Sequence, residues 1–244
     1  MAISRIYQNI DLQAGAQIEL DAQASHHLAR VLRAKISDTV TIFNGRGGEF
    51  VSVIENISKK SVQLRIGEFN SREAESSLNL YLAQGIARGE KMDYIIQKAV
   101  ELGVKKIMPL MTERGSVKLN DERREKRAQH WQSIIISACE QSGRNRIPEL
   151  LPVQSLVDWL PNVKAAQGFV LAPLSSNKLS SFDLPTEGDV VLLIGPEGGL
   201  SPREIELAQQ LNFSALNLGP RILRTETAAV AALTALQCGF GDMH

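Results

Sequence analysis

The chain has 244 residues, of which 43% are hydrophobic, and its 27 Lys and Arg balance 27 Asp and Glu. This length allows one large domain or two modest ones, and a net charge of zero argues against a surface that is basic throughout. No apolar run approaches the roughly 18 residues that a membrane helix requires, and the amino terminus lacks the basic-then-apolar pattern of a secretory signal. We therefore expect no membrane partner and a cytoplasmic location.

The first seventy or so residues predict a β-rich domain. Residues 39–66 alternate apolar and polar side chains around Asn44-Gly45 and Gly47-Gly48, which are turn signals between short strands. Residues 24–34 predict a short helix whose basic side chains lie near one side: His26, His27, Arg30 and Arg33. A polar segment of small and charged residues follows, so we place this domain at 1–72, a linker at 73–77 and a second domain at 78–244.

From residue 78 the pattern changes to alternating strands and helices. A strand at 78–86, an amphipathic helix at 92–103 and a strand at 105–111 predict a βαβ unit, and a longer helix is predicted at 123–143. The segments at 168–174 and 189–195 are apolar along their whole length, which is typical of strands in a parallel sheet covered on both faces. The second domain is therefore predicted to have an α/β fold.

The two cysteines, Cys139 and Cys238, lie far apart in the sequence without CxxC spacing or neighbouring histidines. This spacing predicts neither a disulfide framework nor a metal site. Both lie in apolar segments with a helical pattern, so each is predicted to be a small buried side chain.

The segment LLIGPEGGLSPREIELA, at 192–208, joins a predicted strand to a helix through three glycines. Ser201, Pro202 and Glu204 form a capping-box pattern that predicts where the helix begins. The loop before it lies at the carboxyl end of a strand, where open α/β sheets tend to bind ligands. It lacks the GxxxxGK[ST] and GxGxxG patterns, and the charge of Glu197 opposes a phosphate. Two interpretations remain: a structural turn, or close approach of the backbone to an uncharged or cationic ligand.

A second segment, LNLGPRILRTETAAVAALTALQ at 216–237, favours the ligand. It predicts a short strand, a turn, and an alanine-rich helix that Thr225 or Thr227 can cap. Arg224 and Glu226 lie beside these threonines, where they either pair with each other or serve a ligand.

Together these two segments resemble the cofactor-binding signature of the SPOUT methyltransferases, which have a deep trefoil knot. More narrowly, the chain resembles the RsmE family, the 16S ribosomal RNA uracil-N3 methyltransferases. HHLARVLRA and the strands after it match that family's RNA-binding barrel, and QKAVELGVKKIMPLMTERG and ACEQSGRNRIPEL match its central motifs. The resemblance implies a small PUA-like β-barrel followed by a SPOUT-type, trefoil-knotted parallel-sheet α/β domain. Asn212 and Arg88 depart from the family pattern, which favours glycine and lysine at these positions.

The resemblance implies S-adenosylmethionine as the cofactor, held against three loops. It assigns cofactor binding to Leu171, Ala172, Pro173, Gly195, Pro196, Gly198, Gly199, Leu218, Gly219, Ile222, Leu223, Thr225 and Thr227. Glycines in such loops let backbone groups approach an adenine ring, and Ile222 and Leu223 supply apolar cover. A carboxylate at Glu197 is compatible with the positive sulfonium centre.

The implied reaction is methylation of N3 of a specific uridine in the 16S rRNA of the small ribosomal subunit. Uracil N3 is normally protonated and base-paired, so the enzyme must expose the base and assist loss of a proton. Our hypothesis is that Arg224 orients the uracil and stabilises its developing anion, and that Glu197 or Glu226 accepts the proton.

Three alternatives to this activity fit part of the sequence. One is a non-catalytic rRNA-binding or ribosome-assembly protein on the same fold, against which the intact GPEGG and ILRTETA motifs speak. Another is a SPOUT RNA methyltransferase with a different target atom. The third is a nucleotide-using α/β enzyme unrelated to RNA, which the missing GK[ST] motif disfavours.

The RNA surface is predicted to combine basic residues of both domains, because a locally basic surface can engage phosphates while the whole chain stays neutral. The candidates are Arg5, Arg30, Arg33 and Arg46 in the first domain and Arg88, Lys91, Arg114, Arg144 and Arg146 in the second. The SPOUT resemblance also implies a homodimer. The small apolar helix predicted at 228–240 is either part of that interface or an ordinary core helix.

Overall fold

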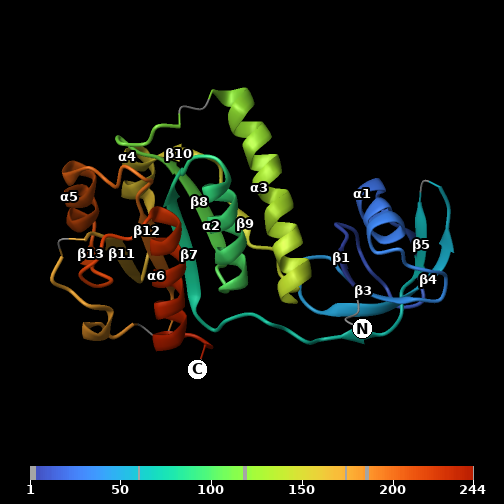
Figure 1. Ribbon diagram of the computed structural model, residues 1–244. Coiled ribbons are helices and arrows are strands. Elements are labelled where there is room, and N and C mark those ends of the chain that lie inside the picture. Colours follow the sequence, from blue (N-terminus) through green and yellow to red (C-terminus); the bar gives the residue numbers. More distant parts are fainter. Residues whose placement is uncertain (1–3, 60, 118–119, 174, 185–186, 244) are drawn as a thin grey trace. The chain divides into compact units, whose positions relative to one another are not determined.

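The computed structural model describes the chain except for residues 1–3, 60, 118–119, 174, 185–186 and 244 (Figure 1). The chain divides into two compact units: Met1–Glu75 with Cys139–Ile147, and Ser76–Ala138 with Pro148–His244. The change from Glu75 to Ser76 falls inside the predicted linker at 73–77. The return of Cys139–Ile147 to the first unit has no counterpart in the sequence pattern, because these residues continue a helical segment that starts in the second unit.

The first unit is built on a six-stranded sheet with the order β1-β3-β4-β5-β2, in which β6 pairs with β4. β1 and β3 are parallel and the other pairs are antiparallel. The alternation predicted at 39–66 is present as β3, β4 and β5, whose inward-facing Ile42, Ile54 and Leu64 are fully buried. The elements of this unit are β1 (Ser4–Tyr7), β2 (Gln17–Glu19), α1 (Ala22–His26), the π-helical turn η1 (His27–Val31), β3 (Thr39–Phe43), β4 (Glu49–Ile57), β5 (Val62–Arg65) and β6 (Phe69–Asn70).

The short helix predicted in the first unit is confirmed as α1 followed by η1. It begins after Asp21, whose carboxylate accepts a hydrogen bond from the backbone N–H of Ala24 at 2.8 Å. Leu28 anchors η1 in the core of the unit. The basic side chains named above are on exposed residues: His26, His27, Arg30 and Arg33.

The second unit contains a seven-stranded sheet with the order β10-β8-β7-β12-β11-β13, in which β9 pairs with β8. Every strand pairing of this sheet among the described residues is parallel, so the predicted α/β fold with a parallel sheet is confirmed. The elements are β7 (Asn79–Gly85), α2 (Glu90–Glu101), β8 (Lys106–Met111), α3 (Asp121–Ser142, whose last turn lies in the first unit), β9 (Glu149–Leu150), β10 (Gln154–Ser155), α4 (Leu156–Trp159), η2 (Leu160–Asn162), β11 (Gln167–Leu171), η3 (Leu179–Ser181), β12 (Asp189–Ile194), α5 (Pro202–Gln210), β13 (Phe213–Leu216) and α6 (Thr225–Phe240).

Helices cover the parallel sheet, as its continuously apolar strands predict. Side chains of β11, β12 and β13, among them Val170 and Leu193, pack against Trp159 of α4 and Ala208 of α5. α2 and α6 pack against each other, and Figure 1 shows them side by side in front of the sheet. The carboxyl ends of the parallel strands share one edge, so the loops that follow β7, β11, β12 and β13 gather there.

The backbone angle of Asn212 explains one departure from the family pattern. Asn212 has φ of 65°, in the left-handed region that favours glycine. This explains why glycine is expected at this position and why asparagine, which also tolerates this conformation, can replace it.

The two cysteines differ in exposure. Cys139, which belongs to the first unit, is buried, but Cys238 is exposed on α6, so the prediction of two buried cysteines is wrong for Cys238. In the part of the chain that the structure describes, no helix is long and apolar enough to cross a membrane.

Candidate functional site

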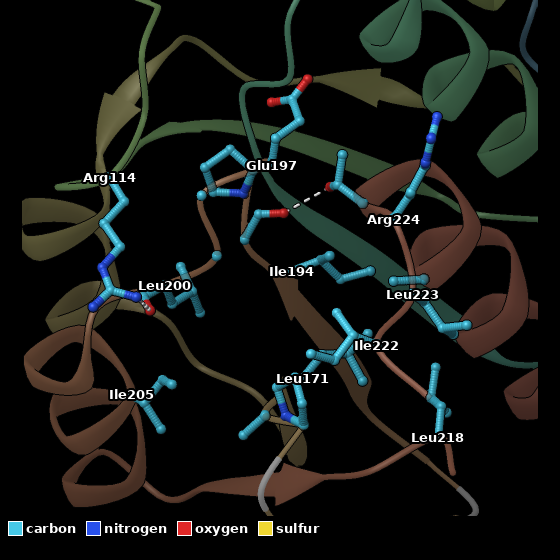
Figure 2. Close-up of a pocket in the computed structure, with 18 of the residues that line it drawn as sticks. Arg114, Leu171, Ile194, Glu197, Leu200, Ile205, Leu218, Ile222, Leu223 and Arg224 are labelled. Carbon is cyan, nitrogen blue, oxygen red and sulfur yellow. Dashed lines mark hydrogen bonds between the residues drawn. The ribbon is translucent and has the colours of Figure 1, made fainter. Parts of the chain in front are cut away.

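A pocket of about 670 Å³ opens in the second unit at the carboxyl ends of β11, β12 and β13. Three segments form its walls: the one after β11, the loop between β12 and α5, and the segment between β13 and α6. Figure 2 shows that apolar side chains dominate its interior, among them Leu171, Ile194 and Leu200, while Ile222 at its edge is 87% exposed. A pocket of this size and character suits a small organic ligand.

All but two of the predicted cofactor residues line this pocket: Leu171, Ala172, Pro173, Gly195, Pro196, Gly198, Gly199, Leu218, Ile222, Leu223 and Thr225. Gly219 and Thr227 are not among the lining residues. The structure adds apolar residues that the sequence did not single out: Leu200, Ile205, Leu216 and Ala228. Ile205 lies one turn into α5, where an amphipathic pattern could have pointed to an inward position.

The loop between β12 and α5 closes tightly on itself. A Cβ atom at Gly195 would come within 2.7 Å of the backbone of Gly199 and Leu200, so only glycine fits there. The predicted capping box is confirmed: Ser201 Oγ accepts from the N–H of Glu204 at 3.1 Å, and the Glu204 carboxylate accepts from the N–H of Ser201 at 2.7 Å. The glycines therefore serve a structural turn and a pocket wall at once.

A buried polar cluster fastens this loop to the start of α6. The carbonyl oxygen of Gly195 accepts hydrogen bonds from Thr225 Oγ1 at 2.7 Å and from Gln84 Nε2 at 3.3 Å. Gln84 Nε2 also donates to Thr225 Oγ1 at 3.0 Å, and Gln84 is fully buried at the end of β7. The expectation that Thr225 or Thr227 caps α6 is wrong, because the N-cap residue is Arg224 and it makes no side-chain cap bond.

Asn217 fastens the other two walls. Its Nδ2 atom donates to the carbonyl oxygens of Pro173 at 3.0 Å and Ser175 at 2.8 Å, and its Oδ1 atom accepts from the N–H of Gly219 at 2.7 Å. The sequence analysis missed both Asn217 and Gln84. In the sequence, each of these residues is only an amide side chain at the end of an apolar strand. An ordinary turn residue has the same pattern, so the sequence gives no specific reason to assign either of them to the site.

Charged side chains meet where the loop after β12 approaches the amino terminus of α2. Glu197 Oε1 accepts from the N–H of Arg88 at 3.1 Å and lies 3.5 Å from Lys91 Nζ. Lys91 Nζ also lies 3.7 Å from Glu226 Oε2. We call Lys91, Glu197 and Arg224, which all line the pocket, the charged rim.

The charge state of Glu197 follows from these contacts. Burial raises the pKa of its carboxyl, but hydrogen bonds from its own backbone N–H and that of Arg88, together with the charge of Lys91, outweigh burial and lower the pKa below its usual value. Glu197 is therefore ionised at neutral pH and offers hydrogen-bond acceptors at the rim.

Arg224 is exposed, and Figure 2 shows its side chain and that of Glu197 extending beyond the same end of the apolar interior. Within the described part of the chain Arg224 forms no ion pair, and Glu226 faces Lys91 instead, so the pairing of Arg224 with Glu226 is not formed. Glu226 itself is not among the residues lining the pocket. Of the candidates for catalysis, the structure thus brings Arg224 and Glu197 to the pocket and connects Glu226 to it through Lys91.

The predicted RNA-contact residues differ in exposure. Those that are exposed are Arg30, Arg33, Arg46 and Arg146 in the first unit and Arg88 and Arg114 in the second. The prediction that Arg144 and Arg146 belong to the second domain is wrong, because Cys139–Ile147 belong to the first unit. Arg46 pairs with Asp11, and Arg146 lies 3.9 Å from Glu73. Arg114 donates to the carbonyl oxygen of Leu200 at 3.3 Å and lines the pocket.

Arg5 and Arg144 belong instead to a buried ion-pair network in the first unit, formed by Arg5, Glu49, Glu75, Arg144 and Asn145. Arg144 is 3% exposed and donates two hydrogen bonds to Glu75, at 2.9 and 2.6 Å. Arg5 donates to Glu49 and to Asn145 Oδ1, each at 2.5 Å. A phosphate could reach these guanidinium groups only if the pairs broke, so the structure gives them a structural role and leaves the predicted RNA contact to the exposed members of the set.

Comparison with known families finds matches in both parts of the chain. Residues 74–237 match the RNA methyltransferase domain, and residues 20–67 match the RNA methyltransferase PUA domain. A protein of Buchnera aphidicola subsp. Schizaphis graminum (strain Sg), named ribosomal RNA small subunit methyltransferase E, is 40% identical over 243 residues, which cover 99% of this chain and 98% of that protein. A protein of the same name in Bacillus subtilis (strain 168) is 31% identical, with 92% of this chain and 91% of that protein covered.

Two solved structures have the same fold over their whole length. A protein of Legionella pneumophila, solved in complex with the bound cofactor SAM, is 43% identical with a TM-score of 0.95. The ribosomal RNA small subunit methyltransferase E of Neisseria gonorrhoeae, solved with bound S-adenosyl methionine, is 35% identical with a TM-score of 0.93. In each comparison both chains are covered to 100%.

Proposed function

The chain belongs to the ribosomal RNA small subunit methyltransferase E family, and from this premise we propose that it methylates N3 of a specific uridine in 16S rRNA. The family name and the cofactor-bound relatives support the broader activity, which is methylation of small-subunit rRNA with S-adenosylmethionine. The observation that carries the proposal is one pocket that combines an apolar interior with the charged rim of Lys91, Glu197 and Arg224.

The pocket fits S-adenosylmethionine in its chemistry. Its apolar side chains suit the adenine ring, its glycine-rich backbone allows close approach, and the Glu197 carboxylate complements a sulfonium. The residues that would hold the cofactor are those of the three walls, kept in place by Gln84, Thr225 and Asn217. When bound, S-adenosylmethionine supplies an electrophilic methyl group on a positively charged sulfur.

The chain's own side chains must hold the uracil and deal with its N3 proton. Arg224 is assigned to orienting the base and to stabilising the negative charge that develops on its oxygens. Glu197 or Glu226 is assigned to accepting the proton.

The finer architecture of the family is part of the proposal. We assign residues 1–72 to a PUA-like barrel, 73–77 to a linker and 78–244 to a SPOUT domain with a trefoil knot, except for Cys139–Ile147, which belong to the first compact unit. We further assign a homodimer that works in the cytoplasm, with α6 contributing to the interface, and an RNA surface that includes Arg30, Arg33, Arg46, Arg88, Arg114 and Arg146.

The test is a methyl-transfer reaction with tritiated S-adenosylmethionine. The substrates are naked 16S rRNA and, in parallel, small subunits from a strain that lacks the modification, and the labelled nucleoside is identified after digestion. We expect 3-methyluridine at a single position. Label at another atom would support a SPOUT enzyme with a different target, and RNA binding without cofactor binding or label would support a non-catalytic rRNA-binding protein.

A further inference from the structure

The position of Lys91 in the structure suggests another role than the one predicted for it. The sequence analysis placed it among the contacts to RNA phosphates, but the structure places it on the wall of the pocket, in the first turn of α2. Its ammonium group lies between two carboxylates, 3.5 Å from Glu197 and 3.7 Å from Glu226. The side chain is 36% exposed, so it is accessible to a ligand without being free in solvent.

Glu197 is held in place next to Lys91 and presents acceptor oxygens. One of them accepts a hydrogen bond from the N–H of Arg88, just before α2, and the loop that carries Glu197 is so tight that a Cβ atom at Gly195 would meet the backbone of Gly199. The hydrogen bonds and the charge of Lys91 that lower its pKa keep it ionised at neutral pH. Glu197 therefore acts as an acceptor and not as a donor over the physiological range.

Glu226 holds the other side of Lys91. Its Oε2 atom is buried and has no hydrogen-bond partner in the described structure, and its side chain is 19% exposed. A buried carboxylate oxygen with one cation nearby draws that cation toward it. Glu226 thus limits the positions that the Lys91 ammonium can take at the rim.

The edge of uracil that carries N3 has a distinct hydrogen-bonding pattern. It presents an acceptor at O2, a donor at N3–H and an acceptor at O4, so its complement is a donor, an acceptor and a donor. Cytosine differs at two of these positions, because its N3 is an acceptor and its exocyclic amine is a donor. An ionised carboxylate opposite N3 therefore favours uracil and disfavours cytosine.

We propose that Lys91, Glu197 and Arg224 form a donor–acceptor–donor edge that recognises the target uracil, in which Lys91 faces O4, Glu197 faces N3–H and Arg224 faces O2. This inference rests on the proposed function and adds a base-recognition role for Lys91 and a reason for selectivity against cytosine. The two cations face the oxygens on which the negative charge of the deprotonated base resides. Glu226 positions the Lys91 ammonium for this contact.

The test compares Lys91→Met and Lys91→Arg with the wild-type chain on two RNAs that differ only in uridine or cytidine at the target. Lys98→Met is the matched control, because Lys98 lies on the same helix, pairs with Glu101 and stands over the ring of Tyr94. Three quantities are measured: RNA affinity as a function of salt, S-adenosylmethionine affinity, and the single-turnover rate at saturating RNA and cofactor.

We expect the wild type to bind the uridine RNA roughly 10-fold more tightly than the cytidine RNA, as one good base contact provides. Lys91→Met should bring this ratio to about 2 and slow the saturated rate roughly 10- to 100-fold. The salt slope of RNA binding and the cofactor affinity of Lys91→Met should match those of the wild type. Lys91→Arg should retain most of the discrimination between uridine and cytidine. Lys98→Met should behave as the wild type in all three measurements.

Different results would overturn the inference or the proposed function. If Lys91→Met weakens both RNAs equally and reduces the salt slope by about 1 at an unchanged saturated rate, Lys91 is a phosphate contact and only the inference fails. Loss of cofactor binding in this variant would place Lys91 in the cofactor site and would also overturn the inference alone. Absence of methyl transfer by the wild type to uridine RNA would overturn the proposed function. If Lys91→Met does not fold, Lys91→Gln is measured in its place and judged by the same ratio and slope.

Discussion

Arg144 in the first unit and Arg224 in the second have the same side chain and opposite surroundings. Arg144 is 3% exposed and makes two hydrogen bonds with Glu75, whereas Arg224 is exposed at the edge of a pocket and forms no ion pair within the described part of the chain. The buried pair determines how the first unit is held together. The exposed arginine keeps its donors available for a ligand, so burial and partners, more than residue type, separate the two roles.

The same contrast holds for the carboxylates. Glu49 and Glu75 of the buried network each face an arginine across a short hydrogen bond. Glu197 at the charged rim is held by a backbone N–H and by Lys91, a partner with greater freedom of movement. Removal of one partner in the network leaves a buried charge uncompensated, while removal of a rim residue leaves the fold nearly unchanged.

The largest expected effect is on turnover in Arg224→Ala. If the arginine stabilises the charge of the uracil anion, the rate of methyl transfer at saturating RNA and cofactor should fall about 100- to 1000-fold. The exposed side chain contributes little to the fold, so the free energy of unfolding should stay within about 0.5 kcal/mol of wild type. The control is Arg203→Ala, whose side chain is 82% exposed and should have no effect on the rate. A near-normal rate in Arg224→Ala would rule out its assigned role.

The next effect is on stability, in Arg144→Met. Methionine leaves the Glu75 carboxylate without its partner, so the free energy of unfolding should fall by about 3 kcal/mol in urea titrations. Arg30→Met, at an exposed position of the same unit, should change it by less than about 0.5 kcal/mol. If the two variants were equally stable, the network would have no structural importance and the contrast between the units would fail.

A smaller effect is expected from the pair Thr225→Val and Thr227→Val. Thr225 donates to the carbonyl oxygen of Gly195, and its loss should weaken S-adenosylmethionine binding roughly 10-fold, because a lost buried hydrogen bond of about 1–2 kcal/mol loosens one pocket wall. Thr227 is exposed and does not line the pocket, so its replacement should leave the affinity unchanged. Calorimetric titration measures both, and equal affinities in the two variants would contradict this role of Thr225.

The smallest effect concerns thiol reactivity. Burial raises the pKa of the Cys139 thiol to about 12, so at pH 8 almost none of it is the reactive thiolate. Cys238 is exposed, so a disulfide reagent should modify one thiol per native chain and two after unfolding. The variant Cys238→Ser should show no fast reaction in the native state. A fast reaction in this variant would mean that the first unit opens around Cys139.

The sequence predicted features that depend on neighbouring residues along the chain. The capping box from Ser201 to Glu204 and the glycine loop follow from local rules of backbone conformation, whereas the strand predicted at 168–174 ends already at Leu171. The apolar strands likewise predicted a parallel sheet, because their pattern reflects burial on both faces.

Features set by contacts between distant segments were not predictable in this way. Thr225 fits a helix cap in sequence, but its hydroxyl bonds to Gly195, which is 30 residues away. The sequence does not distinguish the roles of Arg144 and Arg224, because only the fold shows that Arg144 pairs with Glu75. Lys91 likewise reaches Glu226 through the packing of α2 on α6, and it reaches Glu197 where the loop after β12 approaches the start of α2.

The most direct test of the contrast between the two units is the rate of methyl transfer per folded molecule in Arg144→Met, measured beside Arg224→Ala at a temperature where both are folded. The predicted result is a wild-type rate in the less stable Arg144→Met and a rate lowered about 100- to 1000-fold in the stable Arg224→Ala. The reverse result, or an equal loss of rate in both variants, would contradict the assignment of Arg144 to structure and of Arg224 to the reaction.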